Sequence, residues 1–181
     1  MRRMIVYVVL TILFSGTAAL PQSRSEKNTS TLKLSAAVAA ANPYSGKWTY
    51  RSYLNRPDII VGDDAQKALD LIFGEGAMSF VADPGGKLSG TFDMGGGYVL
   101  DLIGTIVDAT PAAPAVLQIV GIGRPGTPTD AWEYDYVGYL AWQWRNGVDQ
   151  IPAIVGTVIR AKPHGQSKAG VVASFIATKQ Q

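Results

Sequence analysis

The 181-residue chain contains no cysteine and a single histidine, His164. Without cysteine the protein has no disulfide, no thiolate metal ligand and no cysteine to carry the lipid of a lipoprotein signal. One histidine cannot build a histidine-rich metal site, so the sequence predicts neither a metal nor a cofactor. It also offers one histidine base for nucleophilic catalysis, and no G-x-S-x-G motif is present. The sequence therefore shows no recognisable catalytic motif, although an enzyme is not excluded.

Charge is also scarce, since Asp, Glu, Lys and Arg make up only 17% of the chain. Two of the 16 basic residues, Arg2 and Arg3, lie at the extreme N-terminus, so 14 basic residues remain to balance 14 acidic ones. A neutral chain has no positive field to attract nucleic acid or anionic lipid. We expect no nucleic-acid partner.

The N-terminus has the order of a secretory signal peptide: a cationic start, the apolar run 5–14, and small residues at 15–19. The run is too short to span a bilayer, which takes about 20 apolar residues. We expect a signal peptide over 1–19 cleaved after Ala19, a secreted or periplasmic protein, and no stable membrane insertion after cleavage. The alternative is a permanent N-terminal anchor.

Two further regions follow the predicted signal peptide. Residues 20–43 are polar and unpatterned at first and Ala-rich later, which predicts a flexible spacer. From residue 44 onward, short runs rich in Val, Ile, Tyr and Trp alternate with Gly, Pro and Asn clusters. This pattern is typical of strands joined by tight turns. We therefore predict one domain over 44–181.

The runs predict an all-β fold: an antiparallel up-and-down barrel of about eight strands, with a β-sandwich as the alternative. The expected strands are 46–54, 77–82, 87–93, 97–108, 115–122, 132–144, 153–162 and 169–178. One connection differs, because residues 65–73 favour a helix that Asp63 or Asp64 caps and Gly74 ends. We expect this helical insertion between strands 1 and 2 to cover one mouth of the barrel.

The predicted strand 132–144 is the most informative segment. One face of it is aromatic, and the other carries Glu133, Asp135 and Arg145. The aromatic face holds Trp132, Tyr134, Tyr136, Gly138, Leu140, Trp142 and Trp144. It is expected to point inward, either as ordinary core or as the wall of a ligand cavity.

The last two predicted strands are apolar on both faces, as in Ile154-Val155, Val158-Ile159 and Val171-Val172. One apolar face fills the barrel, and the other would remain exposed to solvent. We therefore expect a homo-oligomer through these strands, with Val158 and Val172 assigned to the outer wall.

Three short motifs carry a family resemblance. The first strand opens with Ser-Gly-Lys-Trp at 45–48, residues 86–92 read Gly-Lys-Leu-Ser-Gly-Thr-Phe, and residues 174–179 read Ser-Phe-Ile-Ala-Thr-Lys. Together these resemble the calycin superfamily of avidin-like and lipocalin-like barrels. The resemblance implies that Trp48 packs across the closed end of the barrel. The Asp with which avidins bind biotin is not matched around Ala173 and Ser174, so the resemblance implies the architecture and not that ligand.

These patterns predict an exported binding protein for a small apolar or aromatic ligand. The expected binding residues are Trp48 and Tyr50 from the first strand and Tyr134, Tyr136 and Trp142 from the sixth. They would stack on the ligand and hydrogen-bond to it. Two alternatives stay open: a cofactor-free isomerase or cyclase, which a titratable group inside the cavity would favour, and a structural or interaction module without a ligand.

Overall fold

The structure is a computed structural model that describes residues 42–56 and 65–181. The predicted signal peptide and nearly all of the predicted spacer lie outside the described residues. Among the described residues, no helix is long and apolar enough to span a membrane.

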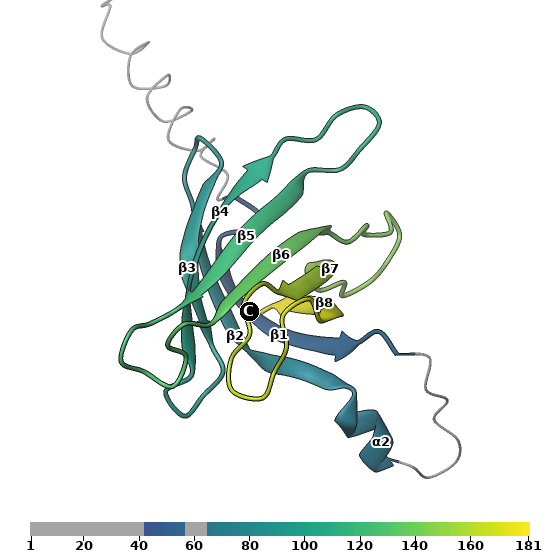
Figure 1. The fold of residues 1–181 in the computed structure, drawn as a ribbon. Coiled ribbons are helices and arrows are strands. Elements are labelled where there is room, and N and C mark those ends of the chain that lie inside the picture. Colours follow the sequence, from purple (N-terminus) through teal and green to yellow (C-terminus); the bar gives the residue numbers. More distant parts are fainter. Residues whose placement is uncertain (1–41, 57–64) are drawn as a thin grey trace, which may run out of the picture. The chain divides into compact units, whose positions relative to one another are not determined.

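The chain forms a closed barrel of eight strands, each antiparallel to its neighbours in sequence order (Figure 1). The strands are β1 (Gly46–Leu54), β2 (Ile72–Ala82), β3 (Lys87–Asp93), β4 (Val99–Val107), β5 (Val116–Gly123), β6 (Glu133–Leu140), β7 (Ala153–Arg160) and β8 (Val172–Lys179). Pairing of β8 with β1 closes the barrel, from Trp48 opposite Lys179 to Leu54 opposite Ala173. Closure leaves no unpaired sheet edge. The predicted all-β up-and-down barrel is confirmed.

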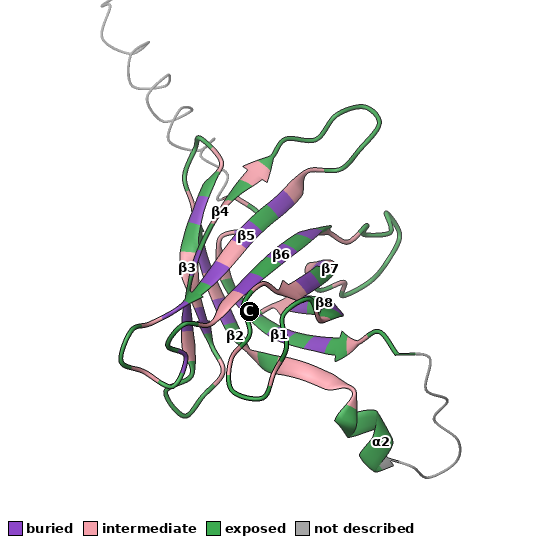
Figure 2. Ribbon diagram, in the orientation of Figure 1, coloured by how far each residue is buried: buried purple, intermediate pink, exposed green. Residues whose placement is uncertain are grey.

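Side chains alternate between the interior and the outer wall of the barrel. Along β1, for example, Trp48, Tyr50 and Ser52 are buried while Lys47, Thr49 and Arg51 are exposed. Figure 2 shows the same alternation as bands along the strands. Because the strand period is two, each strand sends every second residue into one shared interior.

The turns follow from local chemistry at positions that the sequence marks. In the β2–β3 turn the Asp83 carboxylate accepts a hydrogen bond from the Lys87 backbone N–H at 2.8 Å. Gly86 adopts a φ of +77°, a conformation that favours glycine. Such turns join consecutive strands directly and enforce the meander.

The helix, labelled α2 (Ala65–Asp70), does lie between β1 and β2, but it ends three residues before the predicted Phe73. Strand β2 begins at Ile72, where Ile72 pairs with Tyr53 and Gly74 with Ser52. Pairing with β1 therefore overrides the local helical preference. Residues 66–70 are exposed, so α2 does not pack into the barrel mouth as expected (Figure 2).

Strand β6 ends at Leu140, four residues before the prediction. Leu140, opposite Ile154, is the last residue of β6 that pairs with β7. The residues between the two strands form a loop. In that loop the Gln150 side chain accepts from the Trp144 backbone N–H and donates to the Trp144 carbonyl, at 2.7 and 2.6 Å. Trp142 is 80% exposed and Trp144 is 76% exposed. The prediction that they face the barrel interior is wrong.

The structure also shows which of the two apolar faces of β7 points into the barrel. Val158 points into the barrel and is 1% exposed, whereas Val172 on β8 lies on the outer wall and is 44% exposed. The assignment of Val158 to the outer wall is therefore wrong. The outward residues of β7 are Val155, Thr157 and Ile159.

Candidate functional site

An aromatic layer crosses the barrel near its middle. Tyr50 lies at its centre, with ring-centroid distances of 4.7 Å to Phe92, 5.3 Å to Phe175 and 6.2 Å to Tyr136. Tyr136 and Phe175 meet edge to face at 6.1 Å. Edge-to-face contacts of this kind stabilise aromatic clusters beyond simple burial. The layer divides the interior into two parts.

The part of the barrel near the start of β1 is filled. Trp48 is fully buried there, and its indole Nε1 donates a hydrogen bond to the Tyr44 carbonyl at 3.0 Å. The Lys179 ammonium lies 5.4 Å from the centre of the Trp48 ring. The pocket found on this side of the aromatic layer, between residues such as Phe80 and Ile154, holds about 10 Å³. This part of the interior is core.

The part near the end of β1 holds a cavity of about 220 Å³. Its lining residues are Tyr50, Ser52, Phe73, Gly74, Phe92, Met94, Leu100, Trp132, Tyr134, Tyr136, Val158, Arg160 and His164. Most of these side chains are apolar or aromatic, with a few polar groups among them. That composition is typical of small-molecule sites.

Three polar side chains form a hydrogen-bonded chain in this cavity. Arg160 Nε donates to the Tyr134 hydroxyl at 3.4 Å, and that hydroxyl lies 2.6 Å from His164 Nε2. Because the hydroxyl accepts from Arg160, we assign its proton to the bond with Nε2, which places the proton of the neutral ring on Nδ1. Strand β7 supplies Arg160, β6 supplies Tyr134, and the β7–β8 loop supplies His164.

Flat stacking holds the same groups in place. The His164 ring stacks on Trp132 with centroids 3.9 Å apart and planes 16° apart. The Arg160 guanidinium lies 4.9 Å from the centre of the Phe73 ring. Arg160 also donates to the Lys168 carbonyl at 3.1 Å, which ties the β7–β8 loop to the end of β7. The polar chain is therefore fixed from three sides.

Burial shifts the pKa values of three cavity groups. Burial, with a smaller effect from the Arg160 charge, lowers the pKa of His164, so the ring is neutral at pH 7. Burial also raises the pKa of Tyr136, and it raises that of Tyr50 against an opposing hydrogen bond with Ser52. Both phenols stay protonated near neutral pH and remain available as hydrogen-bond groups.

The Tyr136 hydroxyl is not fully enclosed. Within residues 42–56 and 65–181, no fully buried side-chain nitrogen or oxygen lacks a hydrogen-bond partner. Tyr136 contributes only ring contacts and no hydrogen bond within those same ranges. Its hydroxyl oxygen therefore keeps some accessible surface, and Tyr136 is one of the residues that line the cavity. A ligand or water there can use it as a partner.

The structure brings three of the five predicted binding residues together. Tyr50, Tyr134 and Tyr136 line the cavity. Trp48 lies in the packed part of the barrel, and Trp142 is in the exposed β6–β7 loop. The inward direction of Tyr134 and Tyr136 follows from strand alternation. The prediction for Trp142 is wrong because β6 ends at Leu140, two residues before it.

Sequence reasoning missed Arg160 and His164 as cavity residues. Arg160 follows Ile154 and Val158 at even spacing, so alternation places it inward once Val158 is known to be inside. His164 stands out in the sequence only as the single histidine. No local signal shows that this part of the chain folds back over Tyr134, since the contact joins residues 30 positions apart.

Metal binding finds no support in the described part of the chain. No group of three or more His, Asp or Glu side chains is placed there to hold an ion.

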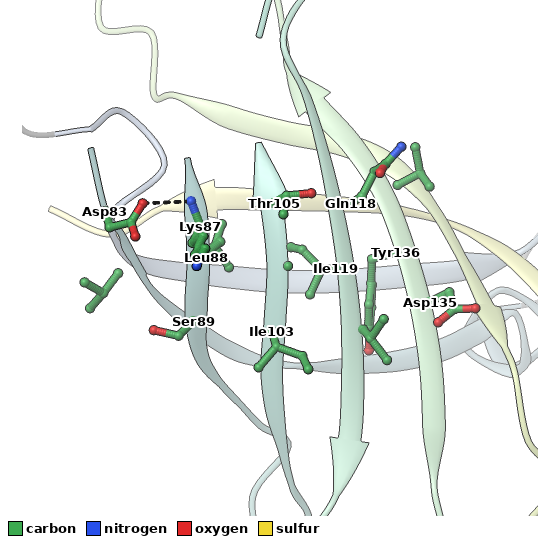
Figure 3. Close-up of a pocket in the computed structure, with 14 residues that line it drawn as sticks. Asp83, Lys87, Leu88, Ser89, Ile103, Thr105, Gln118, Ile119, Asp135 and Tyr136 are labelled. Atoms are coloured by element: carbon green, nitrogen blue, oxygen red, sulfur yellow. Dashed lines mark hydrogen bonds between the residues drawn. The ribbon is translucent and has the colours of Figure 1, made fainter. Parts of the chain in front are cut away.

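A second concave region lies on the outer wall over β2 to β6 (Figure 3). It is an open groove of about 910 Å³ whose lining includes Ser89, Ile103, Gln118 and Asp135. These residues come from neighbouring strands at outward positions. The groove lacks the enclosed aromatic wall and the hydrogen-bonded polar chain of the internal cavity.

Fold and site together define a class of protein: an eight-stranded antiparallel barrel with an aromatic cavity in part of its interior. Comparison with protein-family models, with curated proteins and with solved structures finds no match in any of the three. The resemblance to calycins stays a prediction.

Proposed function

We propose that this chain is a small-molecule-binding protein that holds a partly apolar, aromatic ligand in the barrel cavity. The observation that supports this most directly is the 220 Å³ cavity, which Tyr50, Tyr134, Tyr136 and Trp132 line. Flat side chains favour flat ligands, because stacking and edge contacts need matching planes. The Tyr136 hydroxyl and the Arg160–Tyr134–His164 chain supply hydrogen bonds that would orient such a ligand.

Intrinsic fluorescence tests the proposal because one of the four tryptophans, Trp132, lines the cavity. A variant with Trp142→Phe and Trp144→Phe removes the two exposed indoles of the β6–β7 loop. Titration of this variant with neutral and charged one- and two-ring aromatic compounds should change its emission for at least one compound. Adding Trp132→Phe to the same background is the matched control, and it should abolish the change.

Thermal unfolding gives an independent readout. A ligand at a hundred times its Kd stabilises the folded state by about 2.7 kcal/mol, which raises Tm measurably. If no compound alters either the emission or Tm, the binding proposal fails. The ligand-free structural module would then be the better description.

One observation favours the enzyme alternative. A neutral His164 hydrogen-bonded to Tyr134 is a titratable group inside the cavity, and a neutral imidazole can accept a proton from a bound substrate. A cofactor-free isomerase or cyclase would use it as a general base. Compounds that bind in the titration can be incubated with the protein and then examined by mass and chiral analysis. This separates the binding protein from the enzyme. Isomerised product that disappears in His164→Gln would favour the enzyme.

We also propose export to a secreted or periplasmic location, on the strength of the N-terminal sequence. The expected mature protein begins at Leu20. Mass spectrometry of the protein recovered outside the cytoplasm tests this. An intact N-terminus starting at Met1 would contradict it.

Self-association through β7 and β8 is the last part of the proposal. The outward residues of these strands form two apolar cross-strand pairs, Val155 with Ile176 and Ile159 with Val172. Between them lie Thr157 and Ser174, so the outer face of the two paired strands carries no charge. An uncharged patch can meet a second copy of itself without like-charge repulsion.

A further inference from the structure

The cavity contains a cation without a counter-ion. Arg160 is its only permanently charged lining residue, and no Asp or Glu belongs to the lining. The ion pairs found among the described residues join Arg51 to Glu75, Arg124 to Asp101 and Lys162 to Glu133, and none involves Arg160.

The partners of the guanidinium are all neutral. Its two hydrogen bonds reach the Tyr134 hydroxyl and the Lys168 carbonyl, and its face lies over Phe73. These bonds use two of the five N–H donors that a guanidinium offers. A cation partly removed from water normally finds an anion, because burying an unpaired charge costs free energy. The ligand is the natural source of that anion.

We infer, resting on the proposed function, that the cavity selects aromatic monocarboxylates. In this arrangement the carboxylate binds Arg160 through charge-assisted hydrogen bonds while the ring system lies among Tyr50, Tyr136 and Trp132. The preference is for a single negative charge, because His164 is neutral at pH 7 and the cavity provides one positive charge. The two acceptor oxygens of a planar carboxylate match the planar guanidinium better than the single acceptor oxygen of an amide does.

Two probes of nearly equal shape test this inference: 2-naphthoate, which is charged, and 2-naphthamide, which is not. Calorimetric titration of the unmodified protein should show naphthoate binding about tenfold or more tightly than the amide, as hydrogen bonds to a charged group allow. Arg160→Gln should lower naphthoate affinity by about tenfold or more and change amide affinity by less than about threefold. Arg145→Gln, in the exposed β6–β7 loop, is the matched control and should leave both affinities unchanged.

The outcomes separate this inference from the proposal beneath it. Equal affinity for the two probes would overturn the carboxylate preference while leaving the binding function intact. Binding of neither probe, together with no response to any compound of the fluorescence panel, would overturn both. A preference for naphthoate that persists undiminished in folded Arg160→Gln would assign the selectivity elsewhere and also overturn the role of Arg160. The acid-over-amide comparison in the unmodified protein decides the preference even if the variant does not fold.

Discussion

His164 is the residue whose environment most directly reports the state of the cavity. Burial and the Arg160 charge both lower its pKa, while Tyr134 occupies Nε2. We predict that its proton NMR signal titrates with a midpoint below the ordinary histidine value of 6.5. Removal of one cause should move the midpoint back, so Arg160→Gln should raise it. Because the chain has one histidine, the titrating imidazole signal needs no assignment.

The same shift fixes the sign of a stability change. The folded pKa lies below the unfolded one, so the unfolded chain binds more protons as the pH falls through about 6.5. This lowers the free energy of unfolding on acidification and has no effect well above pH 6.5. His164→Gln should lack this part of the pH dependence, and Arg145→Gln should retain it. A midpoint at or above 6.5 in the unmodified protein would show that the ring is not held as described.

At the scale of elements, the packing of β6 against β7 depends on two facing glycines. Gly138 and Gly156 are register partners, and the Phe175 ring lies against both. A Cβ on Gly156 would lie 2.1 Å from the Val137 carbonyl oxygen and 2.9 Å from the Phe175 ring. Gly156→Ala should therefore destabilise the protein by about 1–3 kcal/mol, as overpacking does. Denaturant unfolding measures this.

Gly74→Ala is the matched control for that variant. It also lies within a strand, but the nearest atom to its added Cβ is the Ser52 hydroxyl at 3.6 Å. An ordinary contact of this kind should leave stability unchanged or slightly higher. Equal stability of Gly156→Ala and the unmodified protein would show that β6 and β7 can move apart freely.

Strand positions were predictable from sequence where the two-residue alternation of apolar side chains and the turn residues indicated the same bounds. The bounds of β1 and β3 matched the prediction, because apolar alternation marks β1 and the turns at 83–86 and 95–97 flank β3. The ends of α2 and β6 did not, because both were decided by strand pairing. Ile72 and Phe73 lie in the predicted helix, but β2 begins at Ile72 and pairs with β1. Trp142 continues the alternation of β6 but has no partner strand.

At the scale of the whole molecule, the proposed self-association would use the outer face of β7 and β8. Val172→Lys with Ile176→Lys would put two charges on the proposed contact surface, since these side chains are 44% and 42% exposed. The oligomer should dissociate while the β-type circular dichroism is retained. Light scattering after size exclusion measures the mass. Val81→Lys, in the groove of Figure 3, is the comparison and should leave the oligomer intact.

A monomeric unmodified protein at micromolar concentration would contradict the assembly prediction. Dissociation by Val81→Lys alone would instead place the contact on the outer groove over β2 to β6. Val158→Lys is unsuitable for this purpose, because Val158 lies in the barrel interior and a lysine there would unfold the protein.

The sequence by itself determined the all-β class, the antiparallel order of strands and the inward direction of Tyr134 and Tyr136. These depend on local alternation and on short turns, both of which are written within a few residues of one another. Tertiary structure alone decided which face of the two-sided apolar β7 is inside, where β6 ends, and that Arg160 and His164 meet Tyr134 in one cavity. These outcomes depend on register between strands distant in sequence, and a local pattern carries no information about its partner.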